Sequence, residues 1–429
     1  MHTDRTDRPD GGPERRTGPE PDDVPPVGGT PDDRASDGSA PEGLTPGEFT
    51  AGDFTPQERA RGRALRRAQT PWALGGRLAG LALALLLGLT PAGAGLVTAA
   101  GTAVGGGRTA TVLAGTVVLV LLGQAVRLPF GARVTAVRRR YGLVTQGWAG
   151  WAADALRGLA LTLVLALPVV LVLFALTDRS PERWWIPAAA GAALLTAALS
   201  FLFPLVVEPV FNRFEPMPPG ARREALLALA ARDGVRVRDV LVADASRRTT
   251  ALNAYVSGFG ATRRIVVYDT LLSSADPGEV ELVVAHELGH VKARDVLGGT
   301  LLGALGAAAA VCALGLLTGW EPLLSAAGAD SAADPRVLPL MAACAALIGA
   351  LAGPPQCAAS RRVEARADRH ALELTGDPER FVAMQRRLAV ANVSDVDPPR
   401  VLELLFATHP SAVRRIAAAR AWRSAAPPA

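Results

Sequence analysis

The chain has 429 residues, of which 49% are hydrophobic and 20% are charged, and its formal net charge is +5. Soluble domains carry roughly 25% charged residues, so this composition excludes an ordinary soluble enzyme and also a fully disordered chain. The arginines cluster beside apolar segments, which indicates membrane topology and no nucleic-acid partner. The cysteines also lie in apolar stretches, and we expect small buried side chains without disulfides at Cys312, Cys344 and Cys357.

Residues 1–70 differ from the rest of the chain. They contain very little Leu, Ile or Val and are dense in Pro, Gly, Asp and Arg. Such a segment buries too little apolar surface to offset the entropy of ordering. It is predicted to be a disordered polar tail.

Six charge-free apolar runs follow, and each approaches the roughly 20 residues that a membrane-spanning helix needs. Any single run is also compatible with a buried core helix, but six in one chain favour a membrane. We therefore expect a predominantly α-helical polytopic membrane protein with about six transmembrane helices, four of them in residues 71–207 and a hairpin in 296–360. The runs lie between Arg77 and Arg108, Thr109 and Val126, Gly158 and Thr177, Trp184 and Val207, Val296 and Trp320, and Val337 and Ser360.

The placement of arginine predicts the orientation of these helices. Arginines are frequent in residues 59–67 and 127–140, whereas the loop before residue 336 carries Glu321, Asp330 and Asp334. Positively charged loops stay in the cytoplasm, so the N-terminus is predicted to be cytoplasmic at the cell (inner) membrane. Residues 208–295 and 361–429 then also lie on that side, where they are candidates to form one domain.

The segment 208–295 has the pattern of a small mixed α+β fold. A helix is predicted over 221–233, and strands over 240–243, 253–256 and 264–268. Asp276 precedes Pro277, and Glu279 follows three residues after Asp276. This is the pattern of a capped helix start.

The helix that starts there carries His286, Glu287 and His290. Side chains four residues apart share one helix face, so both imidazoles can bind one metal ion, and zinc suits them. Glu287 then lies where it can take a proton from an activated water and pass it to a leaving amine. The alternative is an exposed helix with two chance histidines, but the whole chain contains only 5 histidines. We expect one zinc ion per chain.

A catalytic zinc needs a third protein ligand. The remaining histidines are His2, His370 and His409. Glu364 is another candidate, with Asp368 one turn later as the group that orients a ligand histidine. An exposed acidic helix face that pairs with Arg361 and Arg362 explains the same residues, and their spacing does not decide between the two interpretations.

Two further segments are candidates only in the presence of such a site. Asn253 and Tyr255 lie on a predicted strand that could hold an extended peptide by backbone pairing, or form an ordinary hairpin. His409, before the final predicted helix, is a candidate to stabilise an oxyanion, or an ordinary surface or capping residue.

Taken together, these motifs resemble the type I CAAX prenyl proteases, which are integral-membrane zinc metallopeptidases of the gluzincin kind, related to a bacterial heat-shock membrane protease. The resemblance covers about residues 127–423. Its most specific parts are Tyr141–Leu143 with Thr145 and Gln146, Phe211–Phe214, Asn253–Tyr255, Arg264–Leu272, the 286–290 motif, Ser360 and Arg361 leading into Glu364 and Asp368, and Thr408–Pro410 with Arg415.

The resemblance implies that His286, His290 and Glu364 bind zinc, that Glu287 is the general base and acid, and that Asp368 orients a ligand. It also implies that Asn253 binds the substrate backbone and His409 stabilises the transition state. A zincin-like cytoplasmic domain, split by the helical hairpin, would adjoin a large chamber between the helices.

The chain departs from the family pattern in having six predicted spans where seven are usual, and Asp295 where a histidine is often found. Lys292 is the sole lysine, which suggests a GC-rich bacterial genome, where protein prenylation is not expected. We therefore expect peptides or membrane proteins as substrates. The alternatives are a protease that cuts within the bilayer, and an inactive scaffold or signalling receptor that retains the fold.

Overall fold

The computed structural model describes residues 52–425, so most of the predicted polar tail lies outside the described residues. Within that range, six helices are long and apolar enough to cross a membrane, which confirms the predicted helical membrane fold. Five of them are α2 (Pro56–Gly88), α4 (Arg108–Arg140), α5 (Trp148–Arg179), α6 (Trp185–Leu202) and α11 (Asp295–Thr318). The sixth candidate span runs from Pro335 to Thr375 and contains η4 (Pro335–Val337) and α13 (Leu338–Thr375).

The polar-tail prediction was wrong for residues 56–70, which form the first turns of α2. A capping box starts this helix: the Glu58 amide donates to the Thr55 hydroxyl at 3.2 Å, and the Thr55 amide donates to the Glu58 carboxylate at 2.8 Å. Phe54, just before the cap, is buried against Ala389, Val396 and Ile416. Tertiary packing thus orders a segment whose own composition is polar.

The apolar run between Arg77 and Arg108 is not one helix. Helix α2 ends at Gly88, and a second helix, α3 (Pro91–Ala103), follows. The break occurs because a residue before proline avoids the helical conformation. Thr90 accordingly has extended backbone angles. The 13 residues of α3 rise about 20 Å, too little to cross a hydrocarbon core of about 30 Å.

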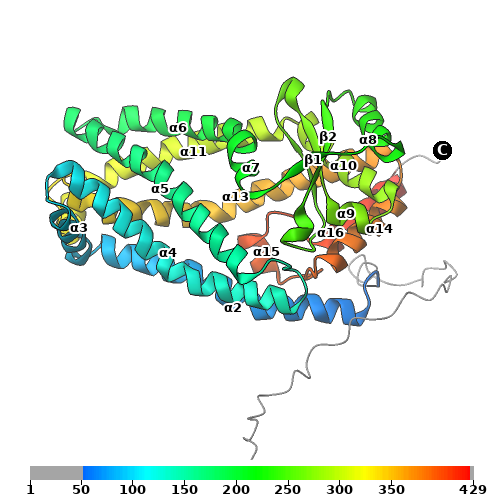
Figure 1. Ribbon diagram of the computed structural model, residues 1–429, viewed down its shortest axis with the longest axis horizontal. Helices are drawn as coiled ribbons and strands as arrows, with labels where there is room; N and C mark the ends of the chain where they lie inside the picture. The colour runs from blue at the N-terminus through cyan, green and yellow to red at the C-terminus, as the bar shows by residue number, and fades with distance from the viewer. Residues whose placement is uncertain (1–51, 426–429) are drawn as a thin grey trace, which may run out of the picture. The chain divides into compact units, whose positions relative to one another are not determined.

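A four-stranded sheet adjoins one end of the spans (Figure 1). Its order is β1-β2-β4-β3, with β3 antiparallel to β4 and at an edge. The predicted strands are confirmed, whereas β1 has only three residues and was not predicted. The strands are β1 (Phe214–Pro216), β2 (Asp239–Ala243), β3 (Ala254–Ser257) and β4 (Arg264–Tyr268).

Helices from both polar segments form one layer system with this sheet. Helices α8 (Ala221–Arg232) and α10 (Pro277–Lys292) of the first segment pack on the sheet, whereas α14 (Pro378–Ala391) and α16 (Ala412–Ala425) of the second pack on α10 and α13, respectively. One hydrophobic core joins Leu226, Ile265 and Leu288 to Phe381 and Ala419. Segments separated by the α11–α13 hairpin therefore form one folded unit.

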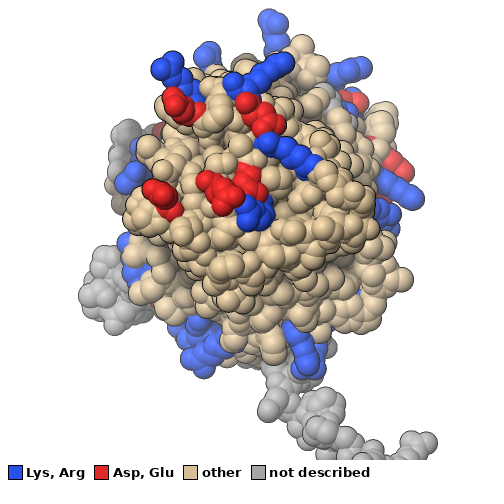
Figure 2. Space-filling view, turned by 90° about the vertical axis from the view of Figure 1, so that its left-hand side faces the viewer, with Lys and Arg blue, Asp and Glu red and all other residues tan. Residues whose placement is uncertain are grey.

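Short elements complete the chain. They are η1 (Phe203–Val207), α7 (Glu208–Phe211), η2 (Ala245–Arg247), η3 (Gly260–Thr262), α9 (Asp269–Ser274), α12 (Glu321–Ala327) and α15 (Arg400–Phe406). The surface near α3, away from the sheet, is largely uncharged and carries a few acidic and basic side chains (Figure 2).

Candidate active site

Helix α10 begins at the predicted cap. The Glu279 amide donates to Asp276 at 3.0 Å, and the Asp276 amide donates to the Glu279 carboxylate at 3.3 Å. One side of α10 buries Val280, Val284 and Leu288 in the core. This packing fixes the rotation of the helix about its axis, and with it the direction of the histidines.

The side chains of His286, His290 and Glu364 converge between α10 and α13. The His286 Nε2 atom lies 3.3 Å from Glu364 Oε2, and His290 Nε2 lies 3.5 Å from Glu364 Oε1. One ligand atom from each residue lies within 4.8 Å of the others. The structure thus brings Glu364 to the histidines, as one of the two interpretations expected.

The donor set fits a zinc ion. Tetrahedral zinc with ligands at about 2.0–2.1 Å places those ligands about 3.4 Å apart, close to the two distances just given. Moreover, Glu364 Oε2 is buried without a hydrogen-bond partner among the described residues. A buried carboxylate oxygen is costly unless something satisfies it, and a cation between the three side chains does so.

Each histidine is held from its other ring nitrogen. His286 Nδ1 lies 2.9 Å from Asp368 Oδ1, and Arg415 Nε donates to Asp368 Oδ2 at 2.8 Å. His290 Nδ1 lies 2.9 Å from Asp295 Oδ2, and Asp295 in turn pairs with Arg366. Both aspartates therefore turn an Nε2 lone pair toward Glu364.

The electrostatics of the site favour positive charge at His286. Burial alone would lower the pKa of His286, but the neighbouring carboxylates of Asp368 and Glu364 raise it to about 9. Burial raises the pKa of Glu287 above its usual range, although both histidines oppose this. A carboxyl group with a raised pKa is a better proton acceptor.

His409 reaches the same cluster from the loop after α15. Its Nε2 atom lies 3.3 Å from Glu364 Oε2, and the side chain is 58% exposed. Arg361 holds this loop by donating to the Glu403 carbonyl at 2.8 Å and the Ala407 carbonyl at 2.7 Å. Within residues 52–425, Arg361 thus binds loop carbonyls, and no ion pair between Glu364 and Arg361 or Arg362 is present.

The structure separates the two candidates on β3. Asn253 is exposed at the start of the strand, and its carbonyl accepts from the Tyr268 amide at 3.0 Å. The Tyr255 ring lies against Tyr268 and Val266, on the sheet face opposite to α10. Its hydroxyl is 3.5 Å from Glu208.

Sequence reasoning missed the roles of Asp295, Arg366 and Arg415. For Asp295 a local signal existed, because it lies five residues after His290, near one and a half helical turns. The two arginines reach the site through contacts between distant segments, for which the sequence offers no local signal.

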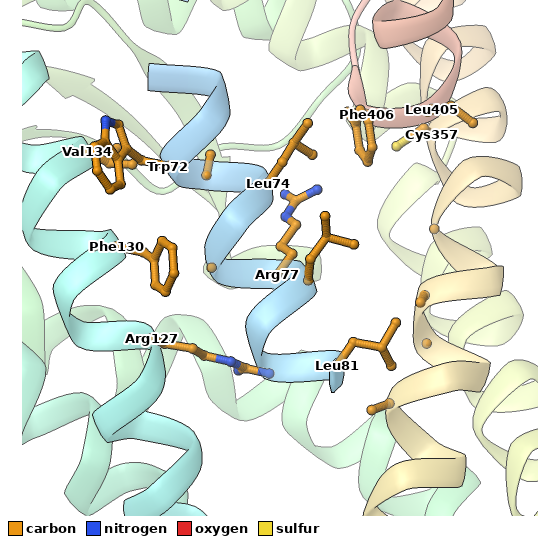
Figure 3. A pocket seen from close by; sticks show the side chains of 18 of the residues that line it. Trp72, Leu74, Arg77, Leu81, Arg127, Phe130, Val134, Cys357, Leu405 and Phe406 are labelled. Atoms are coloured by element: carbon orange, nitrogen blue, oxygen red, sulfur yellow. The ribbon is translucent and has the colours of Figure 1, made fainter. Parts of the chain in front are cut away.

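A cavity of about 1290 Å³ lies beside the cluster, between α2, α4 and α13 (Figure 3). Ser360, one turn before Glu364, and Thr408, next to His409, belong to its lining.

Two sequence models of known families match the chain. Residues 219–423 match peptidase family M48, and residues 45–213 match the family described as "CAAX prenyl protease N-terminal, five membrane helices". In the second region this chain has four candidate spans and the short helix α3.

Individual proteins agree with these matches. A Bacillus subtilis protein named "Uncharacterized metalloprotease YhfN" is 31% identical over 302 residues, 70% of this chain and 71% of that protein. A CAAX prenyl protease 1 homolog from Oryza sativa is 31% identical over 176 residues, 41% of each chain. The crystal structure of Ste24p from S. mikatae superposes with a TM-score of 0.76 at 20% identity, covering 86% of this chain and 90% of that one, and so shares its fold.

Peptidases of the M48 family depend on zinc, in agreement with the cluster of His286, His290 and Glu364. The chain belongs to peptidase family M48 and is a multi-pass membrane metalloprotease.

Proposed function

We propose that the protein is a zinc endopeptidase in which His286, His290 and Glu364 hold one zinc ion per chain. The observation that carries the proposal is the convergence of both Nε2 atoms on the Glu364 carboxylate, at 3.3 and 3.5 Å. When bound, zinc acts as a Lewis acid that activates water for attack on a peptide carbonyl.

The chain's own residues supply the remaining chemistry. Glu287 accepts the proton of the attacking water and delivers it to the leaving amine. His409 donates from its ring to the oxyanion that develops on the carbonyl, and Asp368 holds His286 in the ligating tautomer. Asn253 and the edge strand β3 that follows it pair with the substrate backbone. Tyr255 contributes its main chain, since its ring faces Glu208.

We place the active site at the cytoplasmic face of the cell membrane. The arginines at the start of α2 and the end of α4 lie at the same end as the peptidase helices, as the contacts of Arg66 with Asp395 and of Arg61 with Tyr141 support. Positively charged ends stay cytoplasmic. The substrates are then peptides or membrane proteins presented at that face, without a requirement for a prenyl group.

The two alternatives agree less well with the site. Polar residues such as Lys292 and Asp295 follow the motif, and α10 is not among the candidate spans, which argues against cleavage deep in the bilayer. An inactive scaffold has no need for a complete ligand set with two oriented histidines.

The test is zinc content and peptide cleavage of the full chain in detergent. We expect zinc near one ion per chain and cleavage of a quenched fluorescent peptide. Glu287→Gln removes the proton acceptor but no ligand, so it should retain zinc and lose at least 100-fold in kcat. Glu281→Gln, on the same helix, is the matched control and should keep both.

Two results would contradict the proposal: wild-type protein that carries no zinc when purified without chelators, or a Glu287→Gln variant as active as wild type. Glu364→Ala should lower zinc retention, and unchanged zinc content in that variant would remove Glu364 from the ligand set.

A further inference from the structure

Two arginines line the cavity between α2, α4 and α13. Arg77 points from α2 into the space facing α13, and Arg127 extends from α4 toward α2 near Leu81 (Figure 3). The rest of the lining is mostly apolar and includes Trp72, Phe130 and Phe406.

The two guanidinium groups lie at different levels of α2. The Arg127 Nε atom lies against the backbone of Gly80, so close that a side-chain Cβ there would be 3.0 Å away. The Arg77 guanidinium lies near Leu74, whereas that of Arg127 lies near Leu81 (Figure 3). A carboxylate of an extended peptide in the cavity can therefore interact with either arginine.

These charges border the apolar part of the spans. Arg77 precedes the apolar run that continues through α2 and α3 to Arg108, and Arg127 follows the apolar run of α4 that ends at Val126. Charged side chains next to an apolar span mark binding or transport sites when they face a protein cavity.

No carboxylate among residues 52–425 pairs with them. Arg77 lies over the Phe406 ring at 5.5 Å, and neither arginine has an Asp or Glu partner in this range. Within the described residues, the cavity thus holds two positive charges without an acidic partner.

The course of the cavity identifies the class of anion. Its lining includes Ser360, one turn before Glu364, and Thr408, next to His409, so the cavity ends beside residues of the metal cluster. An anion bound in the cavity therefore lies beside the site where the peptide substrate is held. The cavity residues on α13 extend from Ala346 to Ser360, roughly 21 Å, or about six residues of an extended peptide.

We propose that Arg77 and Arg127 bind a carboxylate of the peptide substrate and thereby select substrates with a negative charge within about six residues of the cleaved bond. This inference rests on the proposed peptidase function. The carboxylate belongs either to the C-terminus of the substrate or to an Asp or Glu side chain, since both present the same two oxygens to a guanidinium.

Three quenched peptides of one sequence separate these sources: a free C-terminal acid, its C-terminal amide, and an amide that carries Glu as its last residue. For wild-type protein we expect kcat/KM to be about 10- to 100-fold higher for the acid than for the amide. If the Glu peptide is also cleaved faster than the amide, the arginines recognise any carboxylate. If only the free acid is cleaved faster than the amide, they recognise the C-terminal carboxylate.

Arg77→Gln and Arg127→Gln should each bring the acid-to-amide ratio toward one, and Arg77→Lys should restore part of it. Arg140→Gln removes the same charge from the exposed end of α4 and should keep the wild-type ratio. Equal cleavage of the acid, amide and Glu peptides by wild type, or a ratio unchanged in Arg77→Gln and Arg127→Gln, would overturn the inference.

Peptide binding to the full-length Glu287→Gln protein separates this inference from the proposed function. Fluorescence anisotropy should show tighter binding of the acid than of the amide, and Arg77→Gln in that background should abolish the difference. If wild type cleaves no peptide but this difference is present, the peptidase function fails and the carboxylate site stands. Equal affinities, or no binding of either peptide, would refute the carboxylate site.

Discussion

At the scale of single residues, the two aspartates behind the histidines are the most informative. Each accepts from an Nδ1 atom at 2.9 Å and is itself held by an arginine. Asp368 is buried and anchored by the buried Arg415, whereas the Arg366 that holds Asp295 is more exposed. The His286 arm is therefore the more rigid of the two.

We predict that Asp368→Asn lowers zinc affinity by about 10- to 100-fold, because the amide no longer fixes the ligating tautomer of His286. Asp295→Asn should have a smaller effect, since water reaches the Arg366 side chain and can replace part of the contact. Chelator competition in detergent measures both affinities. Asp330→Asn, an exposed aspartate far from the site, should leave zinc affinity at the wild-type value; equal losses in all three variants would contradict this assignment.

Arg361 serves a different purpose, because it touches loop carbonyls rather than a ligand. We predict that Arg361→Gln lowers kcat by about 10-fold, since the loop that carries His409 loses three charge-assisted hydrogen bonds. Zinc content should stay unchanged. Arg362→Gln, the exposed neighbour on α13, is the control, and a loss of zinc in Arg361→Gln would show that the loop is not its target.

At the scale of elements, the contact of α10 with α13 brings the ligands together. Gly289 permits it, because a Cβ there would lie 3.1 Å from the His370 Cβ and 3.2 Å from the Ala367 Cα. The Ala367 contact is backbone, so the helices must separate to admit a side chain. The absence of a side chain at Gly289 thus sets the distance between the histidines and Glu364.

We predict that Gly289→Ala lowers the stability of the folded protein by about 1–3 kcal/mol, as overpacking of helix contacts does, and weakens zinc binding. Gly298→Ala on α11 meets no atom within 4 Å and is the matched control. Thermal unfolding in detergent, with and without chelator, measures both effects. A Gly289→Ala protein as stable as the control would show that the contact between α10 and α13 admits a methyl group without cost.

The same contact shows which parts of the site the sequence could predict. Helix α10 and its histidines follow from local signals, namely the cap at Asp276 and the spacing of two imidazoles, and both are present as expected. Spacing left open whether Glu364 joins them, because a helical hairpin separates the two segments and spacing cannot report their packing; the family resemblance alone implied it. The roles of Arg366 and Arg415 were missed for the same reason.

At the level of elements, composition predicted the spans and alternation predicted β2, β3 and β4. The three-residue β1 and the break before α3 were not expected, because a short edge strand has no periodicity and the run from Arg77 to Arg108 was predicted to be one span. The prediction of disorder up to residue 70 was wrong, because packing against α14 and α16 orders the start of α2.

At the scale of the whole molecule, this start of α2 ties a membrane helix to the peptidase part. Phe54 is 2% exposed and packs with Ile416 of α16. Arg420 of the same helix donates to Asp53 at 2.9 Å, and Gly62 lies directly on the Ser394 carbonyl. Helix α16 also carries Arg415, so α2 supports, through α16, the arginine that anchors Asp368.

We predict that Phe54→Ala lowers stability by about 3–5 kcal/mol, as expected for an aromatic side chain removed from a core. Because Arg415 depends on α16, zinc retention should fall as well, although Phe54 is no part of the site. Hydrogen exchange in α16 and zinc content of the purified protein measure the two effects together. Leu78→Ala, on α2 and 64% exposed, should change neither. Faster exchange in α16 with full zinc retention would show that α2 stabilises the peptidase part without positioning its ligands.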